Sequence, residues 1–282
     1  MPRALRLASL TALTMLAFAA NSLLCRVALR DTAIDAASFT SIRLAAGAFV
    51  LAAIVLARKG RPAAAGSWRG GLLLFGYAAF FSFAYRELSA ATGALLLFGA
   101  VQATMLVSGL VSGERLRAVQ FAGLLVAAGG LVVLLLPGLA APPPGAAGFM
   151  FAAGISWGFY SLLGRGAKDP TSATAGNFLR TLPFAALLSL ATVTSAHVDV
   201  AGSTYAVLSG AIASGLGYVL WYAVLPALPA ASAATIQLSV PALAAAGGVV
   251  LLAEPMTSRL LVCSIAILGG IALTLRRPAP SP

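Results

Sequence analysis

Long apolar runs recur along the whole sequence, and each is long enough to cross a membrane as a helix. About 20 apolar residues in a helix span the roughly 30 Å hydrocarbon core of a bilayer. A β-barrel would instead show alternating segments of about 10 residues, whereas these runs are continuous. With 60% hydrophobic and only 9% charged residues, the chain is unlike a soluble domain. The sequence therefore predicts an all-α integral membrane protein.

Ten transmembrane spans can be placed along the chain. The proline-rich residues 137–145 form a linker between the fifth and sixth spans, because proline prevents a helix from continuing. The first apolar run continues too far to be a cleaved secretory signal. The predicted spans are about 7–29, 38–57, 70–87, 90–112, 118–136, 146–165, 173–195, 204–225, 230–252 and 257–275.

The basic residues predict the orientation in the membrane. With the N-terminus in the cytoplasm, 12 of the 18 Lys and Arg fall on the inner side and 4 on the outer side, while Arg43 and Arg180 lie within spans. This bias follows the positive-inside rule. We therefore expect a multi-pass protein of the inner (plasma) membrane with both termini cytoplasmic. Despite the net charge of +11, the basic residues form no single face, so nucleic acid is not an expected partner.

Short motifs recur in the same order in the two halves of the sequence, which indicates a duplication. We expect residues 1–140 and 141–282 to be five-helix repeats. An odd number of spans per repeat inserts the second repeat upside down, as in many secondary transporters. The matched motifs are SLLCR at 22–26 with SLLGR at 161–165, Arg43 with Arg180, and Glu114 and Gly129-Gly130 with Glu254 and Gly269-Gly270.

These features together resemble a known transporter family. Ten spans in two inverted halves, each with a helix-ending glutamate and a Gly-Gly pair, are similar to the EamA branch of the drug/metabolite transporter superfamily. Within that branch the chain looks like the YddG-type aromatic amino acid exporters. The resemblance covers nearly the whole chain and implies a basket of helices around a central cavity. No cofactor or metal is expected, because Cys25 and Cys263 have no metal-binding spacing.

Aromatic residues at helical spacing are the first candidates for the wall of that cavity. Residues three or four positions apart lie on one face of a helix, and rings with polar ends suit a partly apolar solute. For Tyr222, near a span end, anchoring at the membrane surface is the alternative. The candidates are Tyr218 and Tyr222 in the eighth span, Tyr77 and Phe81 in the third, and Trp157 and Tyr160 in the sixth.

Three side-chain amides lie deepest in their spans: Asn21, Gln102 and Gln237. An amide that faces lipid without a partner is costly. We therefore expect each amide either to line the cavity or to donate a hydrogen bond to a neighbouring helix. Phe98 lies four residues before Gln102, so Phe98 shares the face of Gln102 and is a further candidate.

Two prolines and two arginines within spans are the remaining candidates. Pro241 and Pro183 interrupt helical hydrogen bonding, and each is either a gating kink or a static one. Arg43 and Arg180 are charged within the membrane, which is by default a functional feature. Either arginine could extend to the membrane surface, join the two halves, or bind a substrate carboxylate.

The distribution of acids and histidine narrows the function. All seven acids lie at span ends or in loops, and His197 lies in a loop, so the spans contain no obvious proton carrier or catalytic pair. We therefore expect a secondary transporter, not an enzyme, that exports small neutral or zwitterionic metabolites by alternating access. Amino acids, including aromatic ones, are the expected substrates. The alternatives are an efflux carrier of another substrate class, a channel, or a membrane protein without transport activity.

Overall fold

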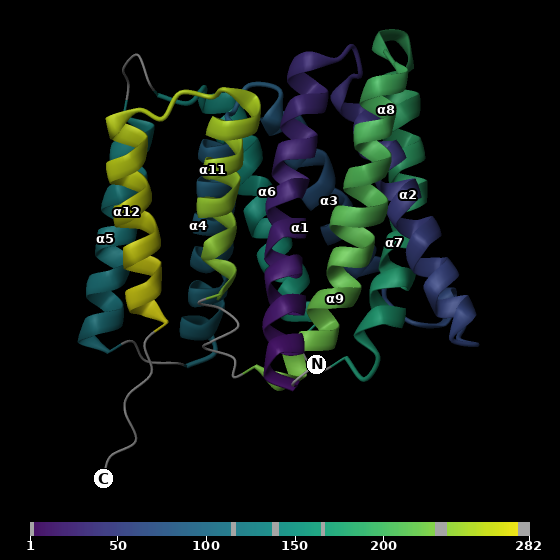
Figure 1. Ribbon diagram of the computed structural model, residues 1–282, viewed down its shortest axis with the longest axis horizontal. Helices are drawn as coiled ribbons and strands as arrows, with labels where there is room; N and C mark the ends of the chain where they lie inside the picture. The colour runs from purple at the N-terminus through teal and green to yellow at the C-terminus, as the bar shows by residue number, and fades with distance from the viewer. Residues whose placement is uncertain (1–2, 114–116, 137–140, 165–166, 229–235, 276–282) are drawn as a thin grey trace.

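The computed structural model describes residues 3–113, 117–136, 141–164, 167–228 and 236–275, and it is a bundle of antiparallel helices (Figure 1). Each of the ten predicted spans contains helix in this part of the chain. The elements are α1 (Arg3–Asp31), α2 (Ala36–Ala57), α3 (Trp68–Tyr85), α4 (Ala90–Val111), α5 (Ala118–Leu135), α6 (Pro144–Leu163), α7 (Pro170–Ala191), α8 (Val200–Val207), the π-helix η3 (Leu208–Leu216), α9 (Gly217–Val224), α11 (Ser239–Leu252) and α12 (Ser258–Thr274).

Length and hydropathy identify the helices that could cross a membrane by themselves. Six segments meet this standard: α1, α2, α4, α5, α6 and the continuous run 200–227, which contains α8, η3 and α9. The helices α11 and α12 are shorter but also apolar. Large apolar side chains such as Phe49, Leu187 and Val250 are exposed on the outside of the bundle, as a lipid-facing surface requires. The chain is a multi-pass membrane protein.

The two halves run in opposite directions through the bundle. The start of α1 and the end of α12 lie at the same face, drawn at the bottom of Figure 1 and called here the terminal face. The helix α1 runs from the terminal face to the opposite face, whereas α6, its counterpart in the second half, begins at the opposite face (Figure 1). The inverted arrangement predicted from five spans per half is therefore present.

Helix packing follows the same two-fold relation. Three helices of the first half pack against their own counterparts in the second: α2 on α7, α4 on α11, and α5 on α12. Other contacts between the halves come in equivalent pairs. The packing of α3 on α6 is matched by the run α8–η3–α9 on α1, and the packing of α4 on α6 is matched by α11 on α1. Contacts between halves therefore hold the core together.

Glycines allow the closest of these approaches. A methyl group at Gly154 of α6 would lie 2.5 Å from the Cβ of Ala100 in α4, and one at Gly158 would lie 2.8 Å from the Cβ of Thr104. Neither position has room for a side chain, so this pair of glycines, four residues apart, sets how closely α4 and α6 pack.

The two prolines within spans have different surroundings. The ninth span is interrupted at Leu238, which is a turn between the helical residues 236–237 and the start of α11 at Ser239. Pro241 therefore lies in the first turn of α11, and the backbone of Leu238 keeps a right-handed helical conformation (φ −66°, ψ −14°), so a gating role for this proline stays a prediction. A proline fits there because backbone N–H groups of the first turn have no partner within the helix. Pro183, by contrast, lies inside the unbroken helix α7.

Candidate functional site

Aromatic side chains of five helices meet in the centre of the bundle and form a connected group, called here the ring cluster. Trp157 of α6 lies in its middle, with its ring centroid 4.8 Å from that of Tyr77 and 5.4 Å from that of Tyr160. The ring of Tyr218 stacks on Trp157 at 5.3 Å with an angle of 18° between the planes. The members of the ring cluster are Phe18, Tyr77, Phe81, Tyr85, Trp157, Tyr160, Phe178, Tyr218 and Trp221.

A short chain of hydrogen bonds runs beside the ring cluster and crosses between the halves. The Ser209 hydroxyl of η3 donates to the Asn21 side-chain oxygen at 2.7 Å, and the Asn21 amide nitrogen donates to the Tyr77 hydroxyl oxygen at 3.1 Å. All three side chains are buried. Of the two uses predicted for Asn21, hydrogen bonding between helices is therefore present, and it fixes the Tyr77 ring at the centre.

Arg43 of α2 lies against the same rings. Its side chain is 2% exposed, and its Cζ atom lies 5.3 Å from the ring centroid of Tyr77 and 4.9 Å from that of Phe81. The Nη1 nitrogen is buried and makes no hydrogen bond within the described residues. Cation–π attraction to two rings offsets part of the cost of burying this charge, but the guanidinium keeps an unused donor.

Arg180 of α7 has a different environment. Its Nη1 donates to the carbonyl oxygens of Ala65 and Gly176, each at 2.8 Å, and its Nη2 donates to that of Ala63 at 3.2 Å. This guanidinium therefore ties the loop between α2 and α3 to α7 at the terminal face. Among its predicted uses, a structural tie fits these contacts best.

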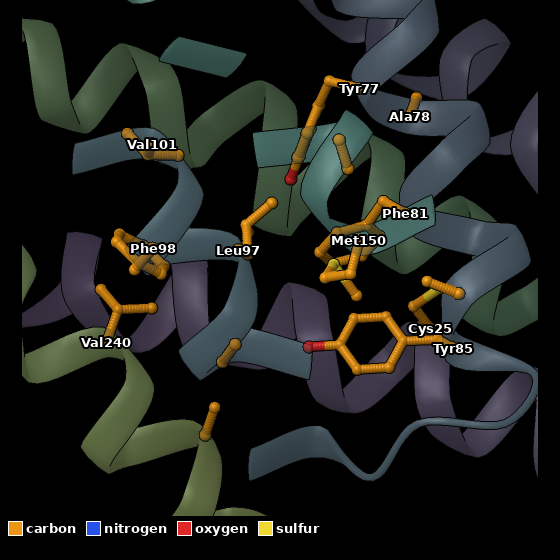
Figure 2. Close-up of a cluster of buried hydrophobic side chains, with 14 of the residues drawn as sticks. Cys25, Tyr77, Ala78, Phe81, Tyr85, Leu97, Phe98, Val101, Met150 and Val240 are labelled. Atoms are coloured by element: carbon orange, nitrogen blue, oxygen red, sulfur yellow. The ribbon is translucent and has the colours of Figure 1, made fainter. Parts of the chain in front are cut away.

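The opposite-face end of the bundle is held together by an ion pair. The Arg26 Nε atom lies 3.0 Å from the Glu254 carboxylate. The other Glu254 oxygen accepts the backbone N–H of Ala90 at 2.8 Å, and Arg26 also donates to the carbonyl of Tyr85 at 3.0 Å. Glu254, which follows α11, thus contacts α1 and α4 directly, and Arg26 extends the connection to α3. In Figure 2, Tyr85 lies beside Cys25 and Phe81 in the packed region next to this ion pair.

A hollow lies toward the terminal face, between α1 and α11. It has a volume of about 650 Å³, and its wall is almost entirely apolar. Met15 and Leu16 line it on α1, and Leu243 lines it on α11. Phe18, slightly farther along α1, contacts Tyr218 with ring centroids 5.9 Å apart. Phe18 therefore links the stretch of α1 that lines this hollow to the ring cluster.

Comparison with known proteins places this architecture in a family. The sequence model of the EamA-like transporter family matches the chain twice, at residues 6–136 and 145–276. The chain belongs to the EamA-like transporter family. An uncharacterized protein of Pseudomonas aeruginosa is 59% identical over 268 residues, which cover 94% of this chain and 93% of that protein. A protein of known crystal structure, 25% identical, has a similar fold with a TM-score of 0.66 over 93% of this chain and 98% of that one.

The EamA-like architecture brings together some of the predicted site residues and not others. Tyr77, Phe81, Trp157, Tyr160 and Tyr218 all lie in the ring cluster, with Asn21 and Arg43 in contact with it. Each half of this transporter contributes to the group. The prediction of a central aromatic wall therefore agrees with where these residues lie, while their role in binding stays a prediction.

Four predicted residues make no described ring pair or hydrogen bond with the ring cluster: Phe98, Gln102, Gln237 and Tyr222. Phe98 is buried and lies on the side toward Val240 of α11, away from Tyr77 (Figure 2). Gln102, one turn beyond Phe98, is half-buried, as are Gln237 and Tyr222. Tyr222 packs against the core, and a role in binding stays a prediction for all four residues.

Two polar residues of the transporter's centre were not predicted from the sequence. Ser209 starts the hydrogen-bond chain to Asn21. Asn177 of α7 accepts the backbone N–H of Ser67 at 2.8 Å and donates to the Tyr160 hydroxyl at 3.4 Å. The available signal was weak: Asn177 is an amide inside a predicted span, like Asn21, whereas Ser209 is a small residue of the kind that commonly packs between membrane helices.

Proposed function

We propose that this protein is a secondary transporter that exports small neutral or zwitterionic metabolites from the cytoplasm, with amino acids, including aromatic ones, as substrates. Membership of the EamA-like family supports membrane transport. The ring cluster carries the proposal for the substrate, because a stack of Trp157 and Tyr218 with polar groups beside it suits a molecule with an apolar ring and a polar end.

The origin of the cluster in both halves supports alternating access. Tyr77 and Phe81 belong to the first half, while Trp157 and Tyr218 belong to the second. Motion of one half against the other would therefore open and rebuild the same group of rings. The Arg26–Glu254 ion pair lies at the opposite-face end, and the hollow beside Met15 lies toward the terminal face. The basic residues favour the terminal face as the cytoplasmic one.

Exchange of labelled phenylalanine in liposomes that contain the purified protein tests the proposal. We expect saturable counterflow, which Trp157→Leu should reduce by about tenfold because the variant loses the stacked ring. Phe159→Leu is the matched control, since Phe159 lies two residues away on α6 and is 49% exposed. Counterflow that survives Trp157→Leu would move the site away from the ring cluster, and no counterflow of any amino acid would reject this substrate class.

Coupling to protons can be measured in the same liposomes. We propose downhill or weakly coupled transport, because the acids of the described residues lie at helix ends or in loops and the one buried acid, Glu254, is paired with Arg26. An imposed proton gradient should therefore change the final accumulation of phenylalanine little. Strong, gradient-driven accumulation would contradict this part of the proposal.

A further inference from the structure

The unused donor of Arg43 calls for an acceptor that the described protein does not supply. The two ion pairs present in the described residues are Arg26–Glu254 and Arg30–Asp31. Neither includes Arg43, although its side chain is almost completely buried. A buried cation without a counter-ion is costly, so a purely structural arginine would be expected to have a partner, as Arg180 has.

The hydrogen-bond chain beside Arg43 ends in a second unused donor. Ser209 donates to Asn21, and Asn21 donates to the Tyr77 hydroxyl oxygen. The Tyr77 hydroxyl therefore acts as an acceptor, and its own proton has no acceptor among the described hydrogen bonds. Because the guanidinium of Arg43 lies against the Tyr77 ring, two donors without acceptors come from neighbouring side chains. Two donors side by side suit the two oxygens of a carboxylate.

We infer that Arg43 and Tyr77 bind the carboxylate of the transported molecule, while the stacked rings of Trp157 and Tyr218 receive its apolar part. This inference rests on the proposed function and narrows the substrate class. The transported molecule carries a carboxylate, so cationic and uncharged compounds that lack one are excluded as substrates. One guanidinium suits a carboxylate better than a phosphate, which commonly requires several cations.

Ligand binding can be measured without transport, through the intrinsic fluorescence of the three tryptophans, Trp157 among them, in purified protein reconstituted in lipid nanodiscs. Four compounds share a phenyl ring and differ in their charged groups: phenylalanine, 3-phenylpropionate, phenylalanine amide and phenethylamine. We expect the two carboxylates to bind at least about tenfold more tightly than the two compounds without one, since hydrogen bonds to a charged group contribute about this much. Equal binding of all four, or binding of none, would overturn the inference.

Arg43→Met is the decisive variant, and Arg180→Met is its matched control. Arg43→Met should remove the preference for carboxylates, whereas Arg180→Met should keep it because that guanidinium already bonds to carbonyls. Preference retained in Arg43→Met would overturn the inference. Tyr77→Phe removes only the hydroxyl, so it should weaken the binding of the two carboxylates several-fold and leave the binding of phenethylamine unchanged. An unchanged preference in Tyr77→Phe would remove that residue from the site.

Two further outcomes separate the possible explanations. Chloride can be compared with phenylalanine as a competitor of 3-phenylpropionate, with sulfate used to keep the ionic strength constant. If chloride displaces 3-phenylpropionate as effectively as phenylalanine, Arg43 binds an inorganic anion and the inference is overturned. Carboxylate-selective binding without any counterflow in liposomes would support the binding site and reject the proposed transport function. If Arg43→Met fails to fold while Tyr77→Phe leaves binding unchanged, Arg43 is structural and the inference fails.

Discussion

Arg43 and Arg180 occupy the same position in the two repeats by the sequence match, on α2 and α7, which pack against each other. Arg180 donates to three backbone carbonyls, whereas Arg43 lies against two rings and has a nitrogen that makes no hydrogen bond in the described structure. The comparison shows that a residue kept in both halves of a duplicated protein need not keep its role. One arginine ties a loop to a helix, and the other has a buried donor that we infer binds a ligand.

The starts of the two helices have not diverged in this way. Asp35 precedes α2 and accepts hydrogen bonds from the backbone N–H groups of Ala37 and Ser38. Asp169 precedes α7 and accepts from the backbone N–H of Ser172. Both helices thus begin with the same capping residue. The distance from cap to arginine does differ, since Arg43 lies eight residues after Asp35 and Arg180 eleven residues after Asp169, so the contrast between the arginines goes with a shift of three residues along the helix.

The largest loss of stability is expected at a third arginine, Arg26, whose partner is an acid. Glu254→Ala leaves Arg26 half-buried without its counter-ion and Ala90 without an acceptor for its N–H. We expect a loss of about 3 kcal/mol in the free energy of unfolding, measured by denaturant titration in mixed micelles. The exposed Glu87, in the loop after α3, is the control, and Glu87→Ala should change little. Equal losses in the two variants would show that the ion pair adds nothing.

Arg180→Met should have the next largest effect on stability. Removing this guanidinium leaves the carbonyls of Ala63 and Ala65 without their donors, which should cost about 2 kcal/mol in the same titration. Arg69→Met is the control, because Arg69 is exposed in the first turn of α3. If Arg180→Met unfolds at the wild-type denaturant concentration, the tie between the loop and α7 is not needed.

The cap of α2 should contribute less, and its contribution should depend on pH. Burial raises the pKa of Asp35, but hydrogen bonds from Ser38, His197 and Ala37 outweigh burial and hold the pKa below its ordinary value. Stability from a lowered carboxyl pKa is present above the ordinary aspartate pKa of about 3.9 and disappears as the pH falls through the lower folded value. Asp35→Ala should therefore cost about 1 kcal/mol at pH 7.

Unfolding measured from pH 7 down to pH 3 tests this dependence. The difference between wild type and Asp35→Ala should stay constant to about pH 5 and shrink below about pH 4. Asp35→Asn keeps a capping oxygen and should retain most of the stability at pH 7. A difference that grows on acidification would mean that the sign of the pKa shift is wrong.

The smallest change in stability is expected for Arg43→Met, and it bears most directly on the comparison. Replacing a buried, unpaired charge with an apolar side chain of similar length is often neutral or stabilising. We expect the free energy of unfolding to change by less than about 1 kcal/mol, in contrast to Arg180→Met. If both variants lose the same stability, the two arginines are alike in function and the contrast between them fails.

The sequence was sufficient for the helices and their order, because apolar runs and the positions of basic residues report directly on membrane crossing. It also identified Arg43 and Arg180 as the two charges inside spans. It could not distinguish them, because the partners of Arg180 are backbone carbonyls at Ala63 and Ala65. Every residue has a carbonyl, so such partners leave no trace in the side-chain sequence.

Side-chain spacing also has limits that Phe98 and Ser209 illustrate. Periodicity correctly groups residues on one face of a helix, but it does not say which neighbour that face meets. Phe98 shares a face of its helix with Gln102, and the neighbour that it meets is Val240 of α11 (Figure 2), which its spacing could not indicate. Ser209 bonds to Asn21, which lies 188 residues earlier in the chain. Such a long-range contact depends on the packing of η3 against α1 and has no local signal.

The helices α5 and α12 have a contact that resembles the interface of a symmetric homodimer. A methyl group at Gly130 would lie 3.1 Å from the side chain of Ile267, and one at Gly270 would lie 2.9 Å from the Cβ of Ala127. Each glycine thus meets the residue three positions before the other, so one patch pairs with its own copy. An ancestral chain of half this length could have self-associated through the same patch. Fusion of two such copies removes the dependence of this association on protein concentration.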